Sequence, residues 1–369
     1  MRANPACVTE LLWSFDEIHP PACKRQRVRK PAVSRRLPIH QTSGENSMKK
    51  SLIALAVLAA SGAAMAQSSV TLYGRADVGV GSEKVDGVSS TKMINGGLTT
   101  SRWGLRGSED LGGGLKAQFK FEQRLDLSTG EVQSPSFKGE ASLGLSGGFG
   151  GLTLGRFSTI YDDVRALSYT SNVFDSSFTP ASNGVYKSGG DYSSRFNSQV
   201  RYDLPSMAGF YGSLAYAFES AADANDGMVG VKLGYKNGPL NVALGTQKEK
   251  AKDDDYLALS ANYDFGAASV SAGYNSRKGT DAKGDDTELT VGVNVPVGAF
   301  DISVGYATSK TEIGGGTSAK ASGLGLGATY KMSKRTKLYT ALRDIENKDG
   351  AGNKTSENRL FALGVRHDF

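Results

Sequence analysis

The sequence is poor in cysteine, histidine and tryptophan, with two, three and two residues among 369. Both cysteines, Cys7 and Cys23, lie within the first 66 residues, and His367 is the one histidine beyond them. This scarcity excludes a disulfide framework and a thiol nucleophile for residues 67–369, and it leaves little material for a Ser–His pair or a histidine-based zinc site. We therefore expect no enzyme, no metal site and no cofactor in this part of the chain.

Long apolar runs are also scarce, and the clearest one follows Lys49 and Lys50. Residues 48–66 combine two lysines, an apolar stretch and a small-x-small site that ends at Ala66, which is the pattern of a signal peptide. We predict that Met48 is the initiator and that residues 1–47 are an upstream mis-start or untranslated extension. The alternative for residues 24–30 is a basic arm that binds nucleic acid.

The basic charge balance belongs to this N-terminal region. The full chain has a net charge of +6, but residues 1–66 hold 10 of its 43 Lys and Arg residues and 4 of its 37 Asp and Glu residues. The remaining 67–369 segment is formally neutral, so we expect no nucleic-acid partner for it.

From Val70 onward the chain alternates between apolar and polar residues. In 70–80 the apolar positions include Val70 and Leu72, and the polar positions include Arg75 and Asp77. The same period of two recurs through 115–125, 210–218, 257–265, 289–295 and 300–306. Such alternation predicts strands with one apolar and one polar face, as in a soluble sandwich or a membrane barrel.

Export, strand number and connection lengths favour the barrel. We count about sixteen strands and no later apolar stretch long enough for a membrane-spanning helix. Predicted tight turns, at 237–238, 266, 296–298 and 333–334, alternate with predicted long loops at 81–97, 126–139, 158–194, 278–286, 310–320 and 345–357. We therefore predict an all-β, 16-stranded antiparallel transmembrane β-barrel over 67–369, enclosing an aqueous lumen in the outer membrane.

Residues 158–194 form the longest predicted loop and are rich in aromatic and acidic side chains. Loops of this length are usually functional or disordered. We interpret this one, the third external loop, as folding inward to narrow the pore, and Asp162, Asp163 and Asp175 as its acidic wall. An ordinary surface loop with solvated acids is the alternative.

The last strand pattern ends on an aromatic residue. Phe361, Leu363, Val365 and Phe369 share one face of residues 360–369. We interpret the terminal Phe369 as a signal for the outer-membrane assembly machinery. Other aromatic residues that end strand faces fit a girdle where lipid meets water.

Several motifs resemble the Gram-negative general porins of the beta-proteobacterial type. They are residues 68–74, 101–117, 151–156 and 195–198, together with Tyr202 and Phe369. The resemblance spans residues 67–369. It implies a homotrimer of sixteen-stranded barrels, a third external loop inside the lumen, and passive diffusion of small hydrophilic solutes and ions, often with anion preference.

The resemblance also implies wall arginines that face the acidic loop across the constriction. Arg102 and Arg195 match two of these positions, whereas Gly139 stands at a third, with Lys138 beside it. The prediction is therefore a weak to moderate anion preference. The polar strand faces independently supply lumen arginines, among which we assign Arg75 and Arg124 to the basic wall with Arg102 and Arg195; the others are Arg106, Arg201, Arg277 and Arg343. Each arginine could instead serve the structure by binding acids or carbonyls in the wall.

Three other functions compete with a diffusion pore. A catalytic barrel is disfavoured by the scarcity of histidine and thiol. A binding or adhesion barrel would act through its external loops and need no open lumen. A solute-specific channel is closest to our interpretation, because aromatic residues that stack against a particular solute cannot be placed from sequence.

Overall fold

The computed structural model describes residues 69–169, 177–180, 192–220, 225–280 and 284–369. The described residues form one antiparallel sheet of seventeen strands, the α-helix α2 (Ile160–Arg165) and the 3₁₀-helix η1 (Ala166–Tyr169). The strands are β1 (Ser69–Val85), β2 (Val88–Asn95), β3 (Arg102–Gly112), β4 (Leu115–Arg124), β5 (Glu140–Gly147), β6 (Gly150–Ser158), β7 (Arg195–Asp203), β8 (Phe210–Ser220), β9 (Asn225–Asn237), β10 (Leu240–Glu249), β11 (Asp254–Asp264), β12 (Ser269–Lys278), β13 (Asp285–Val297), β14 (Phe300–Ile313), β15 (Gly316–Lys331), β16 (Thr336–Asp349) and β17 (Lys354–Asp368).

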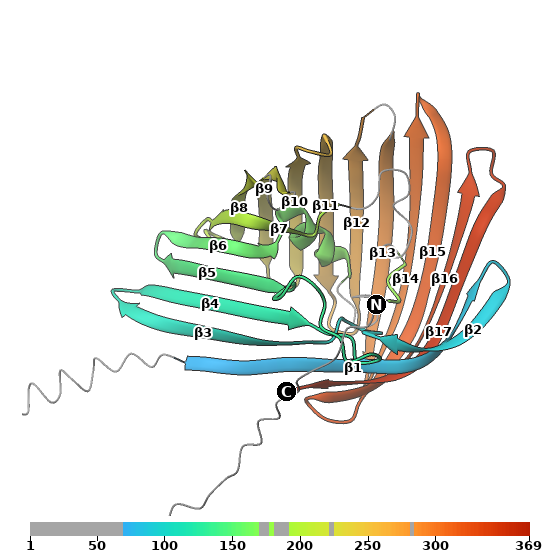
Figure 1. Ribbon diagram of the computed structural model, residues 1–369, viewed down its shortest axis with the longest axis horizontal. Helices are drawn as coiled ribbons and strands as arrows, with labels where there is room; N and C mark the ends of the chain where they lie inside the picture. The colour runs from blue at the N-terminus through green and yellow to red at the C-terminus, as the bar shows by residue number, and fades with distance from the viewer. Residues whose placement is uncertain (1–68, 170–176, 181–191, 221–224, 281–283) are drawn as a thin grey trace, which may run out of the picture. The chain divides into compact units, whose positions relative to one another are not determined.

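The sheet closes on itself through its first and last strands. From β3 to β17 each strand pairs with the next one along the chain, and β17 pairs with β1, with Val78 opposite Val365 (Figure 1). The N-terminal part of β1, Ser69–Arg75, pairs with β3, and its C-terminal part, Val78–Val85, pairs with β2. Strands β2 and β3 together therefore occupy one position in the wall. The result is a closed barrel of 16 strand positions, which confirms the predicted fold class.

Apolar residues face outward from this barrel, the reverse of a soluble fold. Val70, Leu72, Leu289 and Leu363 are 57–65% exposed, whereas inward residues such as Glu288 are buried. Rows of exposed apolar side chains on this scale mark a surface that contacts lipid. The predicted apolar faces of β8, β11, β13 and β14 all point outward. One exposed residue from each strand shows this: Phe210, Leu259, Leu289 and Ile302.

Short turns join the strands at the end that carries residues 238–239, 265–268, 298–299 and 332–335, where the sequence predicts them. Several of the predicted long loops at the other end are wrong. Strand β1 continues to Val85 and β2 begins at Val88, so Asp86 and Gly87 form the whole turn. Both adopt positive φ angles, 48° and 89°. Gly314 and Gly315 likewise join β14 to β15, and residues 350–353 join β16 to β17.

These segments were predicted as loops because they are polar on both faces. Outside the membrane both faces of a strand meet water, so polar residues there do not mark a loop. Backbone pairing, such as Lys310 opposite Lys320, holds these extensions together. The prediction at 126–139 holds better, since no named strand lies between β4 and β5.

The C-terminal residue completes the closure of the barrel. The Phe369 amide donates to the Gly74 carbonyl and the Gly74 amide to the Phe369 carbonyl, each at 3.0 Å. The Phe369 ring lies against Gly74, where an added Cβ would be 2.2 Å from the ring Cζ. Phe361, Leu363, Val365 and Phe369 are all exposed, which confirms their predicted shared face.

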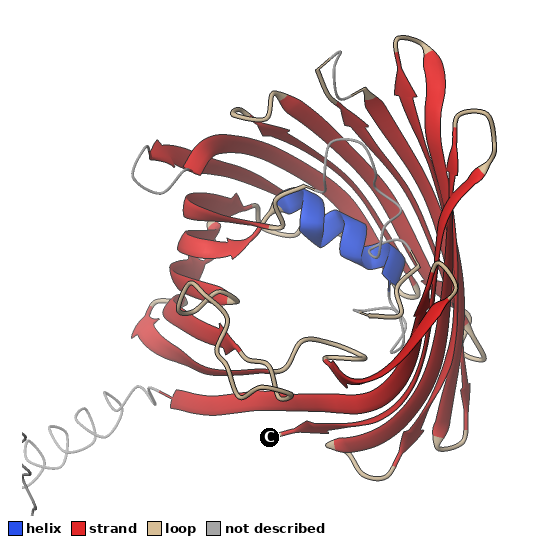
Figure 2. Ribbon diagram, turned by 45° about the vertical axis from the view of Figure 1, so that its right-hand side comes forward, coloured by secondary structure: helices blue, strands red, loops and turns tan. Residues whose placement is uncertain are grey.

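The described part of segment 158–194 lies against the inner face of the wall. Helix α2 contacts β8–β11 and η1 contacts β10–β13, and Figure 2 shows the helix within the ring of strands. Ile160, Tyr161 and Val164 of α2 are fully buried. Residues 170–176 and 181–191 are outside the described part of the chain, so the inward course of the complete loop stays a prediction.

Candidate pore constriction

Three of the predicted wall arginines occupy neighbouring register positions. Arg75 of β1 lies opposite Arg102 of β3, and Arg102 lies opposite Arg124 of β4. All three alternate with outward residues such as Leu72 and Trp103, so they belong to the inner face. The structure thus gathers Arg75, Arg102 and Arg124 into one row across three adjacent wall positions, which we call the arginine row.

The arginines of this row differ in how far their charge is neutralised. The Nε of Arg75 lies 2.5 Å from Asp368 Oδ1. The Arg102 Nε donates to the Thr100 carbonyl at 2.9 Å, and its Nη1 lies 3.3 Å from Glu122 Oε1. The Nε of Arg124 has no hydrogen-bond partner among the described residues. Positive charge is therefore least compensated at Arg124.

Arg195, at the start of β7, lies near the arginine row. Its Nε donates to the Gly139 carbonyl at 2.6 Å, and its charge lies within electrostatic range of Arg124. Gly139 has no room for a side chain, because an added Cβ would be 2.9 Å from the Glu122 carbonyl oxygen. The position that lacks the expected third arginine therefore contributes a carbonyl that holds Arg195 in place.

The acidic residues of α2 face this basic wall. Thr159 caps the helix, and Asp162 and Asp163 occupy its first turn, where a carboxylate is favoured by the helix dipole. Asp162 accepts a hydrogen bond of 2.5 Å from the Tyr192 hydroxyl and lies within electrostatic range of Arg124. The third predicted acid, Asp175, lies outside the described residues.

Asp163 bridges the helix to two basic side chains of the wall. Its Oδ2 lies 2.9 Å from Arg201 Nη1 and 3.5 Å from Lys232 Nζ. Burial raises the pKa of the Asp163 carboxyl, while the neighbouring Arg201 and Lys232 oppose that rise. The carboxylate is thus held by opposite charge in a partly dehydrated place.

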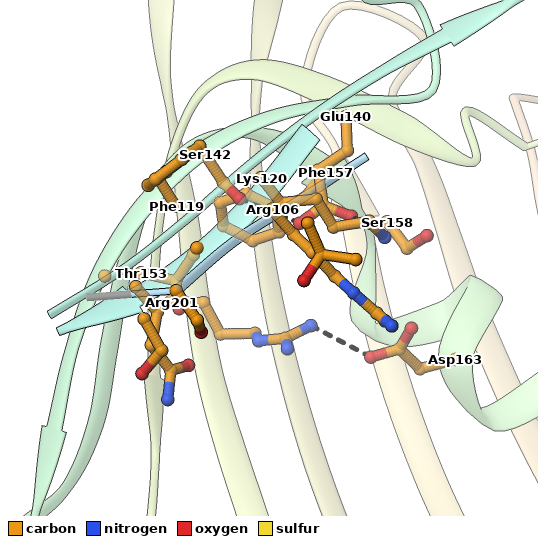
Figure 3. A pocket seen from close by; sticks show the side chains of 16 residues that line it. Arg106, Phe119, Lys120, Glu140, Ser142, Thr153, Phe157, Ser158, Asp163 and Arg201 are labelled. Atoms are coloured by element: carbon orange, nitrogen blue, oxygen red, sulfur yellow. Dashed lines mark hydrogen bonds and ion pairs between the residues drawn. The ribbon is translucent and has the colours of Figure 1, made fainter. Parts of the chain in front are cut away.

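A polar cavity of about 500 Å³ lies between this helix and the wall. Arg106, Lys120 and Arg201 provide basic groups, and Glu140 and Asp163 provide acidic ones. Figure 3 shows Arg201 reaching toward Asp163 at its edge. Lys120 and Glu140 lie on adjacent strands of the wall, whereas Asp163 faces the wall from the helix. Opposed fixed charges of this kind create a transverse field, which suits polar and ionic solutes better than apolar ones.

A family model described as Gram-negative porin matches residues 52–350 of the chain. The chain belongs to the Gram-negative porin family. The porin is 36% identical over 342 residues to "Outer membrane porin protein 32" of Delftia acidovorans, a match covering 86% of this chain and 95% of that protein. It is also 34% identical over 271 residues to an outer membrane porin protein of Bordetella pertussis, covering 62% and 69% of the two chains.

Solved structures agree with this assignment. The "Anion-selective porin from Comamonas acidovorans" superposes with a TM-score of 0.69 at 29% identity, covering 82% of this chain and all of that one. OmpT of Vibrio cholerae with its loop L8 deleted, at 19% identity and a TM-score of 0.64, shares the fold. The chain is therefore an outer-membrane channel protein and no enzyme.

Two of the other lumen arginines are structural in this porin. Arg277 is fully buried between Asp254 and Asp286, at 3.3 and 2.6 Å. Arg343 is 5% exposed and donates to the Ser177 carbonyl at 2.6 Å. Both serve the wall or the loop, as the structural alternative proposes, whereas Arg106 and Arg201 line the cavity.

Sequence reasoning missed the pair that anchors the porin's helix to the far wall. Arg165 Nη2 of α2 lies 3.2 Å from Glu288 Oε2 of β13, and both side chains are buried. Asn275 also donates to Glu288, at 2.8 Å. Since 123 residues separate Arg165 from Glu288, no local pattern pairs them.

Two further pairs of inward charges could have been found from the period of two. Arg366 and Asp368 alternate with the outward Val365 and Phe369 on β17, and their side chains lie 3.2 Å apart. Lys120 lies 2.7 Å from Glu140 on the inner face.

Within the described ranges of the porin, no group of three His, Cys, Asp or Glu is placed to hold a metal ion. No helix in those ranges is long and apolar enough to cross a membrane.

Proposed function

We propose that this porin lets small hydrophilic solutes and ions diffuse passively across the outer membrane, with a weak to moderate preference for anions. The observation that carries the proposal is the arginine row of the wall facing the acidic first turn of α2. In a narrow aqueous opening these opposed charges favour solutes that are themselves polar or charged.

The sign of the selectivity follows from which charges are compensated. Asp163 is shared by Arg201 and Lys232, so the acidic side carries little net charge at that point. Arg75 and Arg102 form ion pairs with acids. On Arg124 the like charges of Arg195 and Arg102 act more strongly than the acids Glu122 and Asp162, which also lie within electrostatic range. A local positive excess attracts anions, and its partial compensation keeps the preference moderate. The name of the anion-selective relative from Comamonas acidovorans supports the same sign.

Three further features belong to the proposal. We propose that residues 48–66 direct export, that Phe369 is read by the assembly machinery, and that the barrel forms a homotrimer. The motif at residues 48–66 and the exposed terminal ring of Phe369 support the first two. Trimer formation rests on the family resemblance.

The test is a planar-bilayer recording of the protein purified from outer membranes, under a salt gradient. Ohmic conductance steps with a reversal potential on the anion side are expected. A folded barrel that gives no steps would remove the diffusion function. Steps with a cation-side reversal potential would leave the pore and overturn the anion preference.

A further inference from the structure

The inner wall carries a glycine at each of four places where a residue of the described part of segment 158–194 lies directly over a strand. Gly230 of β9, Gly245 of β10, Gly273 of β12 and Gly323 of β15 lie under Ile160, Val164, Ser168 and Pro180 in that order. The four glycines thus lie on four different strands of the wall, each under a described residue of the segment. We call these four residues the glycine seat.

Under α2 the contact leaves no room for a methyl group. A Cβ added to Gly245 would lie 2.8 Å from Val164 Cγ2 and 3.3 Å from Val164 Cβ. A Cβ added to Gly230 would lie 3.3 Å from Ile160 Cβ, which is a milder overlap. Ile160 and Val164 are fully buried, so neither side chain can swing out of the way.

The contact is as close further along the segment. A Cβ on Gly273 would lie 2.8 Å from Ser168 Cβ, and one on Gly323 would lie 2.8 Å from the Pro180 carbonyl oxygen. At Gly323 the obstacle is backbone, which only a shift of the segment could relieve.

Neighbouring inward positions on the same strands carry large side chains. On β10 the inward residue after Gly245 is Gln247, and on β12 Asn275 and Arg277 follow Gly273; all three are buried. Gln247 meets the segment through a hydrogen bond, accepting from the Tyr161 amide at 3.4 Å, whereas at Gly245 and Gly273 side chains of the segment lie directly over the strand backbone. Strand glycines of this kind mark the close approach of another backbone.

We propose that the glycine seat sets the depth at which the segment lies against the wall, and thereby the open cross-section of the pore. Helix α2 and the aqueous path lie in the same lumen. If α2 lay further from the wall, it would therefore narrow the path that solutes take. This inference rests on the proposed diffusion function, since the cross-section matters only if solutes pass.

The competing explanation is that these glycines serve barrel curvature. Glycine also relieves strand bending, and it would then matter whatever lay above it. The two explanations make different predictions. Only if the glycines act as a seat does the effect of replacing one of them depend on the size of the residue that faces it. A substitution in the helix can therefore compensate a substitution in the wall.

The experiment compares single-channel conductance of the full porin with that of Gly245→Ala and Gly230→Ala. We expect a loss of conductance in both, larger for Gly245→Ala because its overlap is larger. Val164→Ala combined with Gly245→Ala removes the nearest methyl and is expected to restore conductance. Gly151→Ala on the inner face of β6 is the matched control, because its Cβ would have no neighbour closer than 3.9 Å. It should leave conductance unchanged.

A second readout is independent of ion flow: the position of α2 in a crystal structure of Gly245→Ala, expected to move away from β10. If the native porin gave no conductance steps, the diffusion function would be refuted. A displacement of α2 in Gly245→Ala would still show that the glycine seat sets the position of the helix. If native steps are normal and folded Gly245→Ala keeps full conductance with α2 unmoved, the seat is overturned. A loss that Val164→Ala fails to restore assigns the glycines to barrel curvature. Should Gly245→Ala not fold, the milder Gly230→Ala decides between the same outcomes.

Discussion

Arg201 Nη1 on strand β7 lies 2.9 Å from Asp163 Oδ2 on helix α2, and Lys232 Nζ on β9 lies 3.5 Å from the same oxygen. One carboxylate of the helix is therefore shared by two cations of the wall. This arrangement fixes the helix and also determines how much positive charge the wall presents to a passing ion.

Asp163→Asn is expected to increase anion preference. The substitution keeps the size of the side chain but leaves Arg201 and Lys232 without their shared counter-charge, so the positive potential near the cavity rises. The measurement is the reversal potential in a salt gradient, which should move further to the anion side. Asp253→Asn, in the turn after β10 where the carboxylate pairs with exposed Lys248, is a control expected to change nothing.

Acidification is expected to act in the same direction in the native porin. Because burial raises the pKa of Asp163, its carboxyl gains a proton at a higher pH than a solvated aspartate does as the pH falls. The loss of that negative charge leaves Arg201 and Lys232 in excess, so anion preference should grow as the pH is lowered. The change should be smaller in Asp163→Asn. An equal pH response in both proteins would show that Asp163 is not the group responsible.

Arg102→Ala combined with Arg195→Ala is expected to move the reversal potential toward cations. These two arginines lie beside Arg124, and their removal reduces the local positive excess while Glu122 keeps its charge. Arg359→Ala is the matched control, because Arg359 pairs with Asp344 on the outer face of the wall. An unchanged reversal potential in the double variant would remove both residues from the selectivity ring.

Glu288→Gln is expected to destabilise the seating of α2. Removing one member of a buried ion pair typically costs about 3–5 kcal/mol, because the other charge stays buried without its partner. Here that charge is Arg165, and its side chain is only 2% exposed. The measurement is hydrogen exchange of the α2 amides, which should speed up while strand amides on β3 and β4 stay protected. Glu312→Gln, an exposed acid paired with Lys310, should have no such effect.

The barrel could be predicted from the sequence because its main signal is local. Alternation along 70–80 or 289–295 already separates an apolar face from a polar one, whichever strands are neighbours, and the export pattern and strand number then favour a barrel over a sandwich. The arginine row depends on register, which places Arg75 beside Arg102 and Arg102 beside Arg124. Alternation puts each of them on the inner face but cannot say that they are adjacent.

Contacts between segment 158–194 and the wall could not be predicted from the sequence, for a different reason. Arg165 and Glu288, or Val164 and Gly245, come together only when the barrel closes around the segment. Similarly, the strand extensions near residues 81–97 escaped prediction because polar strands in water resemble loops. The sequence thus proposes candidate residues by type and by strand face, and the structure supplies their partners.

Phe369→Ala is expected to lower the amount of porin in the outer membrane without preventing the barrel from folding in detergent. The Phe369 backbone completes the pairing with Gly74, and that pairing does not need the ring. The ring itself is 49% exposed on the outer face, where a recognising protein could contact it.

Phe361→Ala is the matched control for this last prediction, since Phe361 lies on the same outward face and is 45% exposed. If the terminal ring is an assembly signal, outer-membrane yield falls for Phe369→Ala and not for Phe361→Ala, while both purified proteins refold. If the ring only packs against Gly74, Phe369→Ala loses stability in detergent to the same degree as it loses yield. Phe369→Tyr keeps the ring and is expected to retain native yield, which separates loss of the aromatic ring from a general sensitivity of the terminal position.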